Sequence, residues 1–129
     1  MTAPRVLLVD DNHGFRSELR LLLEDCGIEV VAEGENGQEA VELATRTAAD
    51  VVLMDLRMPV MDGLQAARAL RDQVPSLPVI ILSAYEDPAL KSEADAANAY
   101  AYLVKGCAGA LVLDTIEQAW ASRSDGGRG

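Results

Sequence analysis

The chain has 129 residues, and its 11 lysine and arginine residues against 21 aspartate and glutamate residues give a formal net charge of −10. This length is enough for one domain with its own hydrophobic core and leaves little room for a second. The charge argues against direct binding of nucleic acid or of an anionic membrane surface by this domain, because the two lysines, Lys91 and Lys105, are isolated and form no basic patch.

The sequence has no clear signal peptide or membrane-spanning segment, and its cysteines follow no known metal or disulfide pattern. The first apolar run, residues 6–9, is too short for the core of a signal peptide, and no later run approaches the length needed to span a membrane. Cys26 and Cys107 lie far apart and match neither a zinc spacing nor a dense disulfide framework. We therefore expect a cytoplasmic protein in which both cysteines are small buried apolar residues.

Short apolar runs alternate with amphipathic stretches along the chain. Because each crossover between parallel strands is right-handed and covers the sheet, the alternation predicts an α/β fold with a doubly wound five-stranded parallel sheet and helices on both faces. The predicted strands are residues 5–9, 29–32, 51–54, 79–82 and 101–104, each followed by a predicted helix.

The fourth predicted helix, residues 88–97, has few large apolar side chains. Only Leu90, Ala94 and Ala97 are expected to face inward, and two alanines contribute much less burial than two leucines would. We therefore expect this helix to dock weakly and to be mobile. Asn98 follows at a position where helices often end in the left-handed conformation, which asparagine tolerates.

The end of the chain divides into a last helix and a tail. The helix is predicted over residues 108–121, and residues 122–129 have the composition of a linker. We therefore assign residues 1–121 to one domain and expect any output domain to be absent from this chain. The inward positions of the last helix are Val112, Ile116 and Ala119.

Polar side chains follow the predicted strands. Asp10 and Asp11 follow the first strand, Asp55 the third, Ser83 the fourth and Lys105 the fifth. In doubly wound sheets, ligands bind beyond the carboxyl ends of the strands, so we expect these residues to converge on one small surface.

Such a cluster has a definite chemistry. Three neighbouring carboxylates repel one another unless a cation intervenes, and an oxygen-only set suits Mg²⁺, or Mn²⁺ in its place. The single histidine, His13, leaves no zinc set. A carboxylate beside a divalent ion can attack phosphorus, and a lysine and a hydroxyl nearby would bind the phosphoryl oxygens. Asp55 is the best nucleophile candidate because it ends the most continuously apolar strand, which leaves Asp10 and Asp11 as the metal pair.

Each residue also has a structural alternative. Asp10 and Asp11 could end a strand and cap a helix, and Asp55 could form a turn. Lys105 could be a solvated surface lysine, and Ser83 carries no signal alone. Their joint placement at strand ends favours a site.

Four segments resemble the receiver domain of two-component response regulators. The resemblance covers about residues 5–121. It implies a CheY-like, flavodoxin-like fold with strand order 2-1-3-4-5. The last of the four segments ends in Gly106, where many receivers have proline, and in this it resembles the NarL/FixJ subfamily, whose output domain is a helix-turn-helix domain. The segments are Leu-Val-Asp-Asp at 8–11, Val-Leu-Met-Asp-Leu-Arg-Met-Pro-Val-Met-Asp-Gly at 52–63, Leu-Ser-Ala at 82–84 and Tyr-Leu-Val-Lys-Gly at 102–106.

The resemblance implies a role for each matching position. Asp55 would accept a phosphoryl group from a sensor histidine kinase. Asp10, Asp11, Asp55 and the backbone carbonyl of Arg57 would hold Mg²⁺. The groups that would bind the phosphoryl oxygens are Ser83, Lys105 and the backbone N–H groups of Leu56 and Ala84.

The resemblance also implies a switch. Ser83 and Tyr102 would move on phosphorylation and repack the surface of the fourth helix, the fifth strand and the last helix. Arg57 and Tyr85, two residues beyond Asp55 and Ser83, would flank the attacking water and set the phosphoryl lifetime. Such a domain catalyses its own phosphorylation and dephosphorylation without being a conventional enzyme.

Two regions depart from the family pattern. Residues 12–14, Asn-His-Gly, replace the usual His-Pro opening, so His13 is expected to be solvated rather than catalytic. On the last helix, apolar Leu111, Leu113 and Trp120 could contact a second receiver, giving a homodimer, or an attached helix-turn-helix domain. The alternative is that Trp120 folds back over the helix end.

Two other functions are compatible with the pattern. A hydrolase of the haloacid-dehalogenase kind also uses an aspartate at a strand end, but places a second aspartate two residues later, where this chain has Arg57. A degenerate or stand-alone receiver acting only as a protein-binding module is disfavoured, because the set of site residues is intact: Asp10, Asp11, Asp55, Ser83 and Lys105.

Overall fold

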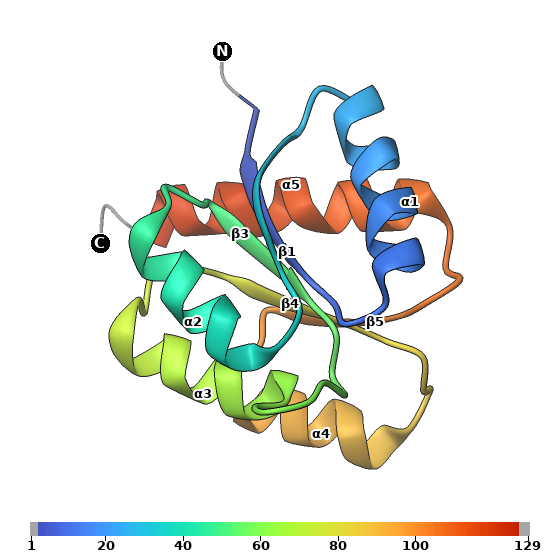
Figure 1. Cartoon of the computed structure of the whole chain (residues 1–129). Helices are drawn as coiled ribbons and strands as arrows, with labels where there is room; N and C mark the ends of the chain where they lie inside the picture. Colours follow the sequence, from blue (N-terminus) through green and yellow to red (C-terminus); the bar gives the residue numbers. More distant parts are fainter. Residues whose placement is uncertain (1–2, 127–129) are drawn as a thin grey trace.

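The computed structural model describes residues 3–126, in which five strands alternate with five helices (Figure 1). No helix in this part of the chain is long and apolar enough to cross a membrane. The strands are β1 (Arg5–Val9), β2 (Glu29–Gly34), β3 (Val51–Met54), β4 (Val79–Ser83) and β5 (Ala101–Val104). The helices are α1 (His13–Asp25), α2 (Gly37–Arg46), α3 (Gly63–Gln73), α4 (Pro88–Ala96) and α5 (Gly109–Gly126).

All strand pairs are parallel, and the sheet order is β2-β1-β3-β4-β5. This confirms the predicted fold class and strand order. Figure 1 shows α1 and α5 on one face of the sheet and α2, α3 and α4 on the other. The first, third and fourth strands therefore lie inside the sheet, and β2 and β5 form its edges.

Two hydrophobic cores lie on opposite faces of the sheet. Side chains alternate along a strand, so Val6 and Leu8 of β1 pack with α1 and α5, while Leu7 and Val9 pack with α2, α3 and α4. Every residue of β3 and β4 is buried, which explains why these strands are continuous apolar runs.

The first four helices each begin at a side-chain cap. In each case a carboxylate or amide oxygen accepts a hydrogen bond from a backbone N–H in the first turn, which would otherwise lack a partner inside the helix. These caps fix where each helix starts after its loop. The caps are Asn12 for α1, Asn36 for α2, Asp62 for α3 and Asp87 for α4.

Helix α4 buries little of its surface. Ala94 is its only buried residue, Leu90 is half-buried, and Ala97 is buried at the C-terminal cap. Asn98 adopts φ = 69°, which confirms the predicted left-handed helix end. The sparse burial supports weak docking, and the mobility of α4 stays a prediction.

The last helix is longer than predicted, because α5 continues to Gly126. Arg123 in this added stretch forms an ion pair with Asp50 at 2.9 Å between Nη1 and Oδ1. This contact holds the C-terminal part of the helix against the loop before β3. Residues 122–126 are therefore helical rather than linker-like, and residues 127–129 lie outside the described part of the chain.

The predicted burial of both cysteines is wrong. Cys26 is exposed, because it is the C-terminal cap of α1 and the chain turns outward there through Gly27 at φ = 81°. Cys107 lies in the loop between β5 and α5 and is only partly buried at the margin of the core beneath α1 and α5.

Candidate functional site

Backbone hydrogen bonds continue one residue beyond the ends of the strands, and they fix the positions of Asp55 and Lys105 relative to the neighbouring strands. The Asp55 N–H donates to the Val9 carbonyl at 2.9 Å, and the Lys105 N–H donates to the Ser83 carbonyl at 2.7 Å. Asp10 follows Val9 directly. These side chains therefore leave the sheet side by side at its carboxyl edge.

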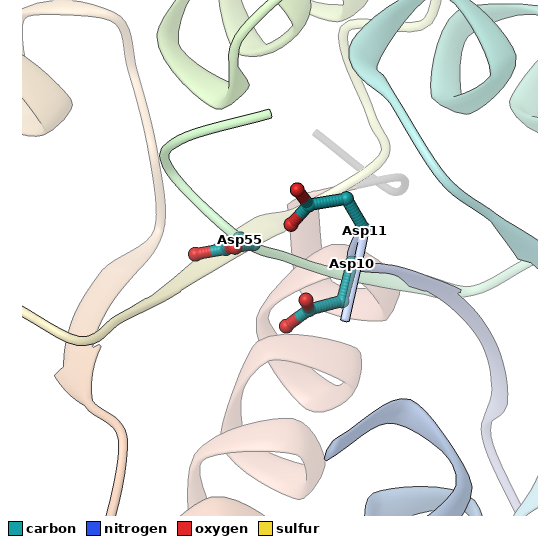
Figure 2. Close-up of side chains that lie close together, drawn as sticks. All are labelled: Asp10, Asp11 and Asp55. Atoms are coloured by element: carbon teal, nitrogen blue, oxygen red, sulfur yellow. The ribbon is translucent and has the colours of Figure 1, made fainter. Parts of the chain in front are cut away.

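Three carboxylates meet at this edge. Asp10, Asp11 and Asp55 each place one oxygen within 4.8 Å of the others (Figure 2). Asp10 and Asp55 are buried, while Asp11 is exposed, so the cluster is open to solvent at Asp11. The Lys105 Nζ lies 2.8 Å from Asp10 Oδ2 and 3.4 Å from Asp55 Oδ2. The structure thus brings together four of the predicted site residues.

The charges in this cluster shift two pKa values. Burial raises the pKa of Asp55, and the negative charge of Asp10 raises it further, which outweighs the opposing effect of Lys105. Burial alone would lower the pKa of Lys105, but its hydrogen bond to Asp10 and the charges of both aspartates outweigh burial and raise it. Lys105 therefore stays a cation, and the charged form of Asp55 is less favourable than that of a free aspartate.

The chain just beyond β3 supplies a backbone donor, and the end of β4 supplies a hydroxyl. The Leu56 N–H donates to Asp55 Oδ1 at 2.8 Å, so one backbone donor already points at this carboxylate. The side chain of Ser83 is fully buried, and its Oγ accepts a hydrogen bond from the Tyr85 N–H at 3.1 Å. Ala84, between them, is exposed.

Two glycines hold the loop between β3 and α3. The Gly63 N–H donates to the Leu56 carbonyl at 2.8 Å, and a Cβ at Gly63 would lie 2.2 Å from the Asp55 carbonyl oxygen. The Gly37 N–H donates to the Met61 carbonyl at 2.7 Å, and a Cβ at Gly37 would lie 2.5 Å from that oxygen. Only a residue without a side chain allows these approaches, so both glycines determine the path of the loop that leaves Asp55.

Val60 lies in the same loop in a strained conformation. Its φ is 69°, and the residue is 76 % exposed. A β-branched residue rarely adopts positive φ, because its Cβ crowds the backbone. The surrounding loop contacts, rather than the preference of valine, therefore impose this conformation.

Two loops and one strand are connected through Tyr85. The Arg57 guanidinium carbon lies 5.1 Å from the centroid of the Tyr85 ring, in a cation–π contact. The Tyr102 hydroxyl on β5 donates a hydrogen bond to the Tyr85 carbonyl. The residues predicted to set the phosphoryl lifetime and to act in the switch thus contact one another.

The three apolar residues singled out on α5 differ in exposure. Leu111 is 46 % exposed. Leu113 and Trp120 are half-buried and pack against the core beneath α1 and α5. The partner contact and its alternative, in which Trp120 folds back over the helix end, both stay predictions.

Sequence reasoning missed two residues of α1 that touch the site. Arg16 is buried, and its Nη1 donates to the Asp10 carbonyl. The ring centroid of Phe15 lies 4.4 Å from the Lys105 Nζ. No local signal in the sequence reveals Arg16, because its counter-charge, Glu33, lies on β2. His13 is exposed, as predicted.

A family model and curated relatives identify the same protein family. The family model described as response regulator receiver domain matches residues 6–117. The response regulator UvrY of Escherichia coli (strain K12) is 37 % identical over 119 residues, which cover 92 % of this chain and 55 % of UvrY. The transcriptional regulatory protein LnrK of Bacillus subtilis (strain 168) is 36 % identical over 124 residues, which cover 95 % of this chain and 54 % of LnrK.

Solved structures agree. The signal receiver domain of the response regulator NarL from Mycobacterium tuberculosis matches with a TM-score of 0.88 at 31 % identity, over 94 % of this chain and 98 % of that one. The chain spans about half the length of the curated relatives it matches.

Proposed function

Since this chain belongs to the response regulator receiver domain family, whose members are signalling switches, we propose that Asp55 accepts a phosphoryl group and that phosphorylation changes the surface formed by α4, β5 and α5. The observation that carries this proposal is the meeting of Asp10, Asp11, Asp55 and Lys105 at one edge of the sheet. Separate roles as caps, turns or solvated residues would not require them to share a cluster.

The proposed step is a transfer to the carboxylate of Asp55. One of its oxygens forms a bond to phosphorus as the bond between phosphorus and the donor breaks, and the donor keeps that electron pair. The Lys105 ammonium, 3.4 Å from Asp55 Oδ2, balances the added negative charge. Ser83 and the backbone N–H groups of Leu56 and Ala84 donate further hydrogen bonds to the phosphoryl oxygens. Hydrolysis of the aspartyl phosphate ends the signal, and Arg57 and Tyr85 flank the attacking water.

The donor set fits Mg²⁺, or Mn²⁺ in its place. Asp10, Asp11 and Asp55, with the backbone carbonyl of Arg57, offer only oxygen atoms, which hard divalent cations prefer. Their three negative charges exceed the single charge of Lys105, so the cluster has a surplus that a divalent cation would neutralise. A bound Mg²⁺ would also offset the charge that develops on the phosphoryl oxygens.

The proposal includes a partner before the switch and a partner after it. A sensor histidine kinase donates the phosphoryl group, and a helix-turn-helix output domain or a second receiver binds the switched surface. The relatives support this, because one is named a transcriptional regulatory protein and this chain matches only about half of it. The unpaired Cys26 and Cys107 fit the reducing cytoplasm, where we place this exchange.

Intact-protein mass spectrometry tests the acceptor. With Mg²⁺ and acetyl phosphate, the wild type is expected to gain one phosphoryl group, about 80 Da, and to lose the gain when the metal is chelated. Asp55→Asn is expected to gain none. The control is Asp72→Asn, an exposed aspartate of α3, which should behave as wild type.

Two outcomes would overturn the proposal. Labelling of Asp55→Asn at the wild-type level would place the acceptor elsewhere. No gain in the wild type, together with no binding of beryllium fluoride, would leave a protein-binding module as the function.

A further inference from the structure

Arg16 is a buried cation that makes polar contacts on several sides. It lies on α1 and is only 6 % exposed. Its Nε donates to Glu33 Oε1 at 2.7 Å, its Nη1 donates to the Asp10 carbonyl oxygen, and its Nη2 lies 3.1 Å from His13 Nδ1. Burying a charge costs free energy unless the charge is paired and hydrogen-bonded. The burial of Arg16 therefore calls for a role that a surface arginine could not fill.

The Asp10 carbonyl is one of four groups that fix Asp10. The Asp10 N–H donates to the Gly34 carbonyl at 3.0 Å. Oδ1 accepts from the Asn12 N–H at 2.8 Å, and Oδ2 accepts from Lys105. The remaining group, the carbonyl oxygen, belongs to the peptide that joins Asp10 to Asp11, and Arg16 holds it. Because a peptide unit is planar, fixing this oxygen also fixes the direction in which Asp11 leaves.

We infer that Arg16 is a positioning residue, which orients the Asp10–Asp11 peptide so that both carboxylates face a divalent cation, and that Glu33 anchors it. This inference rests on the proposed function, because it requires the proposed metal site.

Glu33 is suited to the anchoring role. Burial works to raise its pKa, but hydrogen bonds from Arg20 and Arg16 outweigh burial and lower it, so Glu33 is a carboxylate at neutral pH. Glu33 lies at the end of β2, where it pairs with Leu8 of β1. The anchor is therefore fixed to the same sheet that carries Asp10.

Charge and position predict opposite effects for Arg16. A guanidinium beside a cation site repels the cation, so its charge alone weakens metal binding, and removing that charge would tighten it. If Arg16 instead positions the peptide, removing it weakens metal binding. The sign of the change therefore separates the two roles.

The experiment measures Mn²⁺ affinity from the electron paramagnetic resonance signal of free Mn²⁺. Arg16→Met removes both the charge and the hydrogen bonds, and we expect a Kd about tenfold or more above the wild type, the size seen when groups that orient metal ligands are removed. Glu33→Gln keeps Arg16 but weakens its anchor, so a smaller loss in the same direction is expected.

The chain offers a matched control in Arg20. This residue also pairs with Glu33, through Oε2, but its side chain is 41 % exposed, and within the described residues its hydrogen bonds go to Glu33 and Glu24. Arg20→Gln therefore removes an ion pair between an arginine and Glu33 but leaves the contacts of the Asp10–Asp11 peptide in place. Its Mn²⁺ affinity is expected to stay within about twofold of the wild type.

Urea unfolding of each variant separates positioning from stability. A merely structural role would lower the free energy of unfolding and leave the Mn²⁺ affinity of the folded protein unchanged, which would overturn the inference. Unchanged or tighter binding in both Arg16→Met and Glu33→Gln would overturn it as well. If Arg16→Met does not fold, Arg16→Lys decides, because it keeps the positive charge but cannot contact Glu33 and the Asp10 carbonyl together, so weaker Mn²⁺ binding in it supports positioning and unchanged binding overturns it. Absence of Mn²⁺ binding in the wild type would instead contradict the metal site of the proposed function.

Discussion

The central strands and the α4–β5 edge of this domain differ in how firmly they are packed. All residues of β3 and β4 are buried, as is β1 apart from Arg5. Every residue of β5 is only half-buried, and α4 buries Ala94 alone. The central strands carry Asp10, Asp55 and Ser83, whereas Tyr102 and Lys105 lie on the edge.

This difference suits a switch. The proposed acceptor and metal ligands have to stay in place, and burial of apolar surface at about 25 cal/mol per Å² holds the strands beneath them. A responding surface has to change at low cost, and a helix with few buried contacts does so more easily. Lys105 links the two regions, because it belongs to the edge and bonds the carboxylates of the central strands.

The largest expected effect comes from cutting that link. Lys105→Ala removes the ammonium that contacts Asp10 and Asp55, so we expect some phosphorylation but no response of α4 and β5. Amide chemical shifts of these elements, compared before and after addition of acetyl phosphate, measure the response. Lys91→Ala, an exposed lysine on α4, is the control and should keep it. A wild-type response in Lys105→Ala would contradict the link.

Truncation of one side chain in each region compares their packing directly. Ile81→Ala in β4 removes a fully buried side chain and should lower the free energy of unfolding by about 3–4 kcal/mol. Leu90→Ala in α4 removes a half-buried one and should lower it by about 1 kcal/mol. Urea unfolding measures both values, and equal losses would show that α4 is packed as firmly as the sheet.

A loss between these two values is expected at the loop that leaves Asp55. In Gly63→Ala the new Cβ meets the Asp55 carbonyl oxygen at 2.2 Å, so backbone atoms have to move, and we expect a loss of about 2–3 kcal/mol in urea unfolding. The control is Gly14→Ala in α1, whose Cβ would meet only Asn12 Oδ1 at 3.5 Å. That variant should be neutral or slightly stabilising, because alanine favours helix. Equal effects of the two variants would contradict the close approach.

The smallest expected effect is a gain. Val60→Asn replaces a β-branched residue at φ = 69° with one that tolerates this conformation, so the free energy of unfolding should rise by about 1 kcal/mol. The reciprocal change, Asn98→Val at the same φ of 69°, should lower it by a similar amount. Thermal unfolding checks the pair, and a loss in Val60→Asn would show that valine makes a compensating contact.

Much of the fold was predictable because its central strands are continuous apolar runs. The predicted limits of β1, β3 and β5 agree with the structure. The predicted β2 was two residues too short, because Glu33 and Gly34 interrupt the apolar run, although both pair with β1. The end of α5 was missed for a similar reason, since its Arg123 is held by Asp50, far away in the sequence.

The candidate site was predictable to the same extent. Asp10, Asp11, Asp55 and Lys105 could be placed together because each follows a strand, and the carboxyl ends of parallel strands lie on one edge. Arg16 could not be found, because its neighbours in the sequence give no sign that its side chain turns inward. Its counter-charge, Glu33, lies on β2 and not in α1, so the pair forms only between elements of the folded chain.

The sequence by itself determined the order of strands and helices, the sheet edge that holds the carboxylates and the family, because these follow from local apolar periodicity and from motifs that are contiguous in the chain. Only the tertiary structure decided the contacts that cross between elements: the hold of Arg16 on the Asp10 carbonyl, the strained φ of Val60 and the exposure of Cys26. Each of these depends on which distant atoms meet in the folded chain, and local sequence patterns carry no information about that.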